Sequence, residues 1–294
     1  MEQDSILEWI EYHRSIGFEH FFIYGNDDDY RTLAEVLAPY ISARVVTFTH
    51  CPELGAQIKM YVHFLQWHSH LCEWICLLDQ DEYVRLGGFH DSVAELTNRA
   101  ANSFDSIQLN WLNFGTSGFA QRPTGSVLRH YTRRARALDV HTKHITRAKL
   151  FSVPGALVGP FWHSLPSTQA RTCSALCEPA SFWDWIANGD GKNRYVEYVA
   201  GRSEELLNLG CVAHFHLKAE SDFERRLERG IAGQFHNQTI YRQLSEDPAL
   251  KKQFIDKSNV VEDFYLADYW VRYIQSLLQG VPPWLDPQAA KRPS

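Results

Sequence analysis

Three carboxylates follow an apolar run in the stretch "WICLLDQDEYV", residues 74–84. Asp79, Asp81 and Glu82 lie within four consecutive positions. Two carboxylates about 4 Å apart repel by roughly 4 kcal/mol at an effective dielectric constant near 20, so a cation or a proton is needed to relieve them. Two interpretations stay open: a solvated acidic turn, or oxygen ligands that hold Mg²⁺ or Mn²⁺ together with substrate phosphates.

A second group of candidate ligands is the histidine pair in "GCVAHFHLK". His214 and His216 are two residues apart in a strand-like run, so their side chains point the same way and one or both can reach a metal. The competing interpretation is two half-buried histidines on a strand face. Alternation likewise puts Asp79 and Asp81 on one side of an extended chain, with Gln80 between them.

Aromatic, glycine and further polar residues supply weaker candidates. Aromatic faces can stack on sugar rings, and the glycine-rich "NFGTSG" would let a substrate approach the backbone closely or would simply be a turn. His163 in "FWHS" is another candidate for the site. The carboxylates considered as a general base are Asp184, Asp190 and Glu178. Spacing does not choose among them, so the base is left unassigned.

The segments that must position these residues alternate between the apolar spacing of helices and that of strands. Helical spacing covers residues 4–17, 31–41, 55–70 and 91–101, and strand patterns cover residues 20–24, 43–49, 74–79 and 106–114. This alternation predicts an α/β fold with a parallel sheet covered on both faces. Ligands bind such sheets at the carboxyl ends of the strands, where the acids of residues 79–82 fall.

The domain organisation follows from where this alternation stops. Residues 1–220 are predicted to form one α/β domain, irregular from 115 to 210. Residues 221–280 form a helical C-terminal extension, and residues 281–294 form a poorly ordered tail. The chain has 294 residues, 45% of them hydrophobic, which is enough for one sizeable core.

Net charge and the spacing of the cysteines narrow the class of protein. With 29 Lys and Arg against 35 Asp and Glu, the net charge is −6, which argues against nucleic acid as a partner. No 18-residue apolar run and no signal peptide are found, so a cytoplasmic protein is expected. Peripheral membrane association is left open. The six cysteines have neither zinc nor redox spacing, and Cys72 and Cys76 are interpreted as core thiols.

Five segments in order carry a resemblance to a known family. They are "ILEWIEYHRSIGF…FFIYGN", "LLDQDEY", "LNWLNFGTSG", "KHITR" and "HFHLKAESDFERRLERG". Over residues 2–230 the chain resembles the family-2-like glycosyltransferases, the group that includes glycosyltransferase family 92. The resemblance implies a GT-A fold, with a Rossmann-like, mostly parallel sheet flanked by helices. It also implies inverting, metal-dependent transfer of a hexose from a nucleotide-sugar to a hydroxyl of a glycan or other acceptor. The expected donor is a UDP-sugar.

The resemblance also implies roles for individual residues. Asp81 would hold Mn²⁺ or Mg²⁺ on the diphosphate, Asp79 would reach the ribose or the metal shell, and His214 takes the position of the family's later histidine. The residues implied in binding the nucleotide-sugar are Glu2, Asn26, Asp29, Gln57, Gln80, Lys143, Arg147 and Lys218, with Tyr61 beside Gln57. Those expected on the acceptor side are Glu82, Trp111, Gly115 and His163.

Two departures from the family pattern bear on function. The family opens with a strand that ends in a "K-N-E"-like turn, of which only Glu2 is present here, so a first strand is expected to be missing and Met1 is in question as the true start. Gly25 stands where the family often has an acid. The rival interpretations are a metal-dependent phosphohydrolase or nucleotidyltransferase, and a truncated relative that binds nucleotide-sugar without catalysis.

Overall fold

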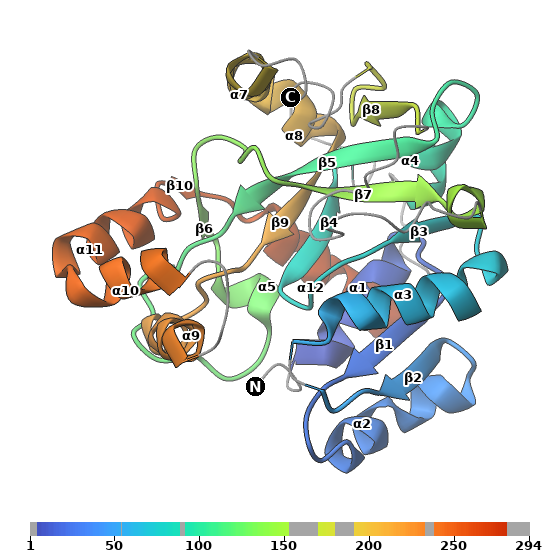
Figure 1. Cartoon of the computed structure of the whole chain (residues 1–294), viewed down its shortest axis with the longest axis horizontal. Helices are drawn as coiled ribbons and strands as arrows, with labels where there is room; N and C mark the ends of the chain where they lie inside the picture. The colour runs from blue at the N-terminus through green and yellow to red at the C-terminus, as the bar shows by residue number, and fades with distance from the viewer. Residues whose placement is uncertain are drawn as a thin grey trace.

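The fold is that of a computed structural model of the whole chain. Residues 5–53, 55–88, 92–152, 170–179, 191–232 and 238–280 are described. Glu2 and His163, both predicted at the site, lie outside these ranges. The predicted α/β class is confirmed, because helices and strands alternate and share one core (Figure 1). In the described ranges, no helix combines the length and the apolar character needed to cross a bilayer.

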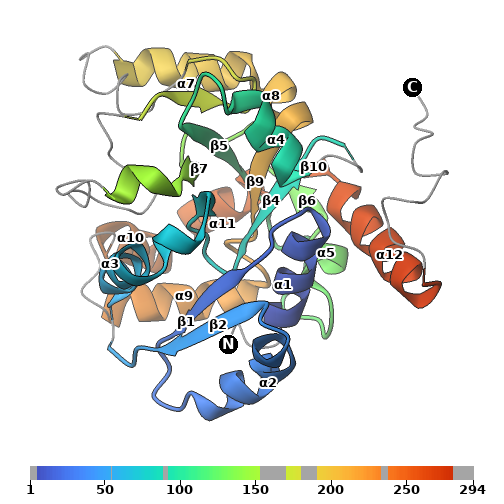
Figure 2. The same cartoon turned by 90° about the vertical axis from the view of Figure 1, so that its right-hand side faces the viewer.

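The first part of the chain forms a two-stranded parallel sheet with helices packed on it (Figure 2). β1 (Phe21–Gly25) pairs with β2 (Val46–His50), beginning with Phe21 opposite Val46. The accompanying helices are α1 (Ile6–Ser15), α2 (Arg31–Ser42), α3 (Gln57–Trp67) and the 3-10 turn η2 (Ser69–Leu71). The periodicity of the sequence predicts each of the three α-helices and both strands.

The larger sheet has the strand order β3-β7-β5-β9-β4, with β8 also paired to β5. Its strands are β3 (Trp74–Cys76), β4 (Glu82–Leu86), β5 (Ser106–Asn113), β7 (Thr142–Arg147), β8 (Thr172–Ser174) and β9 (Gly210–His214). β5 is parallel to β8 and β9, whereas the pairs β3–β7, β5–β7 and β4–β9 are antiparallel. The sheet is therefore mixed rather than mostly parallel, because β4 and β7, which the alternation does not predict, run against their neighbours.

The remaining elements surround this sheet. They are α4 (Val93–Ala100), α5 (Val127–His130), β6 (Arg133–Arg134), η3 (Ala148–Ser152), α7 (Gly191–Gly201), α8 (Ser203–Leu209), α9 (Glu220–Ala232), α10 (Gln238–Glu246), α11 (Pro248–Lys257), β10 (Val261–Glu262) and α12 (Tyr265–Leu278). α9 to α11 pack around a cluster of their own that includes Phe223 and Leu244. α12 instead joins the main core through Leu266 and Trp270.

Among the described residues, the outer edge of β4 is covered by side chains rather than by another strand. Val84 donates its N–H to His13 Nε2 (3.2 Å) and accepts at its carbonyl from the Tyr12 hydroxyl (2.9 Å). The Glu82 carbonyl accepts from Trp9 Nε1 (2.7 Å). Unpaired edge groups invite association and are costly when buried. The buried face of α1 therefore completes the hydrogen bonding of the strand that follows the acidic residues.

Two strand edges face a cavity of about 310 Å³. Hydrogen bonds to the neighbouring β2 segment start at the Phe21 N–H and end at the Gly25 carbonyl, so alternation turns the backbone groups of Phe22 and Tyr24 to the opposite side. On β3, the backbone groups of Trp74 and Cys76 likewise point away from β7, and no strand pairs with them among the described residues. These four residues line the cavity, which is where the expected first strand would fit.

We predict that the cavity between β1 and β3 accepts one extended strand supplied upstream of α1. An N-terminal extension of about 6–10 residues with a strand pattern, the length of a strand and turn, would pair with both edges, and we expect higher solubility, a higher Tm and tighter nucleotide binding than for residues 1–294. The control is an equally long Gly-Ser extension. Purification yield, thermal unfolding and nucleotide titration compare the three chains, and equal values throughout would show that the strand is dispensable.

A second prediction concerns His13, whose burial lowers its pKa to about 3. Since the unfolded value is near 6.5, the contribution of neutral His13 is complete above pH 6.5 and is lost as the pH falls toward 3, by about 1.4 kcal/mol per pH unit. His13→Gln should therefore weaken the loss of unfolding free energy between pH 7 and pH 5 in urea titrations. Identical pH slopes in the wild-type chain and the variant would contradict the prediction.

Candidate functional site

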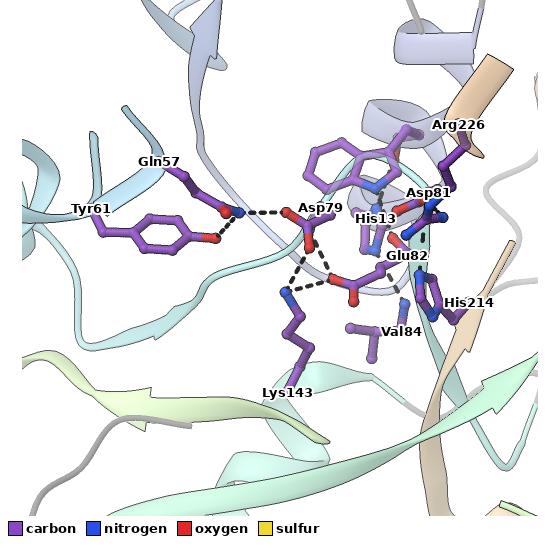
Figure 3. A network of polar contacts seen from close by, with 11 residues as sticks. His13, Gln57, Tyr61, Asp79, Asp81, Glu82, Val84, Lys143, His214 and Arg226 are labelled. Atoms are coloured by element: carbon purple, nitrogen blue, oxygen red, sulfur yellow. Dashed lines mark hydrogen bonds and ion pairs between the residues drawn. The ribbon is translucent and has the colours of Figure 1, made fainter. Parts of the chain in front are cut away.

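The three carboxylates lie at the connection from β3 to β4, and a lysine lies between two of them. Lys143 Nζ, from β7, is 2.9 Å from Asp79 Oδ2 and 3.0 Å from Glu82 Oε2 (Figure 3). The other oxygen of Asp79 accepts from Gln57 Nε2 of α3 (2.9 Å), and Gln57 also donates to the Tyr61 hydroxyl (2.9 Å). The chain itself thus supplies a cation for two of the three acids and fixes the orientation of Asp79.

Burial makes this ion pair tightly coupled. Glu82 is 0% exposed and Lys143 is 3% exposed. Burial alone would lower the pKa of Lys143, but Glu82 and Asp79 hold it well above its usual value. Burial raises the pKa of Glu82, and Lys143 opposes that rise. Removing the lysine charge alone would leave Glu82 without a cation in the interior, whereas Lys143 would keep Asp79 as a partner if Glu82 were removed.

Asp81 contacts a different set of side chains. Its Oδ2 lies 3.8 Å from His214 Nε2 on β9 and 3.8 Å from Arg226 Nη1 on α9 (Figure 3). Burial, followed by the charges of His216 and Arg226, lowers the pKa of His214 well below its usual value, so the imidazole is neutral at pH 7. The prediction that Asp79 and Asp81 share one side of an extended chain is wrong, because residues 77–81 form a loop and turn.

Side chains from neighbouring strands line one face of the sheet above this turn. His141 directly precedes β7 and Lys143 lies on it, two residues apart in extended chain and hence on the same face. On β5, the Trp111 ring is stacked on His141 with centroids 5.2 Å apart and lies 4.1 Å from the ring of His214. His214 in turn is paired with Glu82 across β9 and β4. A row of polar and aromatic side chains therefore extends from β7 to β4.

The residues present fit a metal ion only if substrate completes its coordination. Within the described residues, no group of three or more His, Cys, Asp and Glu side chains is arranged to hold an ion. Asp81 and His214 offer two ligand atoms, and His214 Nδ1 is buried with no hydrogen-bond partner among the described residues. Mg²⁺ is commonly held by one or two carboxylates together with phosphate oxygens and water. An open site of this kind agrees with the donor set, whereas a closed protein cage does not.

The nucleotide-side residues implied by the resemblance are dispersed. Gln57 and Lys143 hold Asp79, as described above, and Gln80 lines the cavity beside the acidic turn. Asn26 and Asp29 lie in the exposed loop after β1, where Asp29 pairs with Arg31 at 2.8 Å.

Three further predicted residues have other surroundings. Lys218 is buried just after β9, with a φ of 52°. Arg147, at the end of β7, pairs with Glu73 (3.2 Å) and lies over the Trp74 ring instead of joining Lys143. Gly115 is required by packing, because a Cβ there would lie 2.4 Å from the Ser258 carbonyl oxygen.

The structure also brings forward residues that the sequence analysis did not select. Arg226 reaches Asp81 from α9 while Nη1 donates to the His216 carbonyl (2.8 Å). Asp139 and His141, hydrogen-bonded to each other at 2.6 Å, lie beside Trp111. The spacing of His141 and Lys143 was a usable signal, since residues two apart on a strand share a face. No local pattern marks Arg226.

Charged residues grouped at a strand connection of an α/β sheet are typical of proteins that bind small charged ligands. Residues 2–156, more than half of the 294-residue chain, match the profile described as glycosyltransferase family 92. A glycosyltransferase family 92 protein of Ricinus communis is 31% identical over 142 residues, covering 46% of this chain and 25% of that protein. One of Oryza sativa subsp. japonica is 32% identical over 144 residues, covering 48% of this chain and 24% of that protein.

The chain belongs to glycosyltransferase family 92. Its matches span about a quarter of the length of these two curated relatives. The profile match contains the acidic turn and Lys143 but ends before His214 and Arg226. Part of the candidate site therefore lies in a segment that the family profile does not cover.

The buried ion pair generates a stability prediction. Lys143→Met leaves Glu82 and Asp79 without their cation, and breaking a buried pair on one side costs about 3–5 kcal/mol. We expect a loss of that size in urea unfolding, and partial recovery in the double variant Lys143→Met with Glu82→Gln, which removes the stranded charge.

The matched control is Lys252→Met, since Lys252 forms an exposed pair with Asp256. Such pairs contribute about 0–1 kcal/mol, so little change is expected. A double variant no more stable than Lys143→Met alone would rule out charge pairing as the reason for the loss.

Proposed function

We propose that this chain is a metal-dependent, inverting glycosyltransferase with a sheet of the GT-A type, which moves a hexose from a UDP-sugar to a hydroxyl group. Membership of glycosyltransferase family 92 supports the transferase class. The observation that carries the proposal is the pair formed by Asp81 and His214, 3.8 Å apart at the strand ends. A neutral imidazole facing a carboxylate offers two ligand atoms to one divalent ion.

The leaving group of the reaction is a nucleoside diphosphate, on which negative charge develops. A Mn²⁺ or Mg²⁺ ion held by Asp81 and His214 would stabilise that charge. Arg226, 3.8 Å from Asp81, adds a guanidinium at the same place. Asp79 is kept in position by Lys143 and Gln57, which suits a role in orienting the sugar nucleotide rather than in accepting a proton.

The end of the same cavity that lies next to the acidic turn supports the placement of the nucleoside, and the stretch between β1 and β3 is left for an extended strand. This end is lined by Tyr61 of α3, Leu78 and Gln80, so apolar and aromatic groups meet a few polar ones, as is usual for small-molecule sites. The proposed acceptor side is the face that carries Trp111. Glu82 is fully buried against Lys143, so its proposed influence on the acceptor is through position and charge, not direct contact.

The deciding experiment measures UDP binding by calorimetry with and without Mn²⁺. We expect Asp81→Ala to abolish the Mn²⁺-dependent part of the affinity while thermal stability holds or rises slightly, because one of three neighbouring carboxylates is removed. Asp28→Ala, in an exposed loop, is the matched control. Unchanged Mn²⁺-dependent affinity in Asp81→Ala would exclude the proposed metal site.

Turnover measurements distinguish His214, the proposed metal ligand, from His216. They also distinguish glycosyl transfer from phosphohydrolysis and from binding without catalysis. His214→Ala should lower turnover well below that of His216→Ala, since only His214 faces Asp81 at 3.8 Å. With UDP-sugar and Mn²⁺, a glycosyltransferase releases UDP, also when water is the acceptor. Release of UMP and sugar phosphate would instead indicate a phosphohydrolase, and binding without turnover would indicate a non-catalytic relative.

A further inference from the structure

An aspartate and a histidine form a hydrogen-bonded pair at the start of β7. His141 Nδ1 lies 2.6 Å from Asp139 Oδ1, and the His141 backbone N–H donates to the same oxygen (2.9 Å). Asn113 Nδ2 of β5 donates to Asp139 Oδ2 (3.2 Å). Asp139 also donates its backbone N–H to the Trp111 carbonyl (2.7 Å). The carboxylate is therefore fixed by both neighbouring strands.

This contact determines which nitrogen of His141 is basic. A carboxylate oxygen can only accept, so Nδ1 donates and Nε2 carries the lone pair of the neutral ring. Burial alone would raise the pKa of Asp139, but its hydrogen bonds from His141 hold it below the usual value. Asp139 thus stays ionised and stabilises the imidazolium that forms when Nε2 takes a proton.

The pair lies on the same face of the sheet as the proposed metal ligands. Trp111 donates its backbone N–H to the His141 carbonyl (2.9 Å), so the strand pairing that orients Lys143 extends to His141. The indole of Trp111 contacts the rings of both His141 and His214. The His141 side chain is 49% exposed, which leaves it accessible to a substrate above the sheet.

The acids of the acidic turn, and His214, already have partners. Asp79 and Glu82 are paired with Lys143, and Asp81 faces His214. Glu178, considered above as a base, pairs with Arg202 at 3.0 Å. The titratable groups around the His141–Asp139 pair are His214 on β9, beyond Trp111, His216 just after β9, and Tyr195 on α7, next to Asp139.

We propose that His141 is the general base of the transfer and that Asp139 is its positioning residue, an inference that rests on the proposed glycosyltransferase function. The acceptor O–H gives its proton to Nε2, and the oxygen electron pair forms the bond to the anomeric carbon. The bond from that carbon to the diphosphate oxygen breaks, its electrons stay on the phosphate, and UDP leaves. The imidazolium then returns its proton to solvent. A histidine held by a carboxylate is suited to this task near neutral pH.

The test uses the whole chain with Mn²⁺ and a panel of UDP-glucose, UDP-galactose and UDP-N-acetylglucosamine, with water as the acceptor. His141→Gln should lower kcat about 10²-fold or more, remove the acidic limb of the pH–rate profile and leave the Kd for UDP within about twofold, since the proposed base does not bind the nucleotide. Asp139→Asn should lower kcat less and also leave the Kd for UDP within about twofold, because the imidazole loses the partner that orients it while nucleotide binding does not involve Asp139. His50→Gln is the control.

The results distinguish a wrong assignment of the general base from a wrong assignment of the glycosyltransferase function. Wild-type turnover together with a His141→Gln variant that keeps kcat and the acidic limb would overturn the base assignment and leave the proposed function standing. Loss of UDP affinity in His141→Gln would also overturn it, since the residue would then serve binding or folding. If the wild-type chain neither binds nor turns over any sugar nucleotide of the panel, the proposed function and this inference fall together.

Discussion

The buried ammonium of Lys143 is the interaction on which the site depends. It allows a loop to hold Asp79 and Glu82 side by side without the repulsion that two neighbouring carboxylates would otherwise impose. Because Glu82 is also the first residue of β4, the ion pair ties the start of that strand to β7. Asp81, between the two acids in sequence, is then directed at β9 and α9.

The same strand links the site to the hydrophobic core. One edge of β4 pairs with β9, and α1 contributes side chains to the other edge through Trp9, Tyr12 and His13. The C-terminal segment contributes as well, because the Tyr265 hydroxyl donates to the Leu86 carbonyl (2.7 Å). Distant parts of the chain therefore meet at β4, and a change that moves α1 would be transmitted to the acidic turn.

Local periodicity predicts the elements of the first half but not the way they pair. The helices and strands up to β3 follow apolar spacing, since each has one face in the core. β4 is missed because all five of its residues are buried, the charged Glu82 and Arg85 among them, so no alternation marks it. The resemblance to the family predicts Gln57 and Lys143 as site residues, and the structure places both next to Asp79. The sequence does not predict Arg226 or Asp139, because strand pairing and helix docking across long stretches of sequence bring them to the site.

The pairing of β4 with β9 has a consequence for the order in which the chain can acquire its structure. Glu82 meets His214, 132 positions later (214 − 82), so β4 has no strand partner until most of the chain has been synthesised. Contacts of such long range form late and slow folding. Residues 2–156, although they carry the family profile, end before this partner and cannot build the site alone. During translation α1 is available much earlier, so its side chains can protect one edge of β4 while the other edge waits.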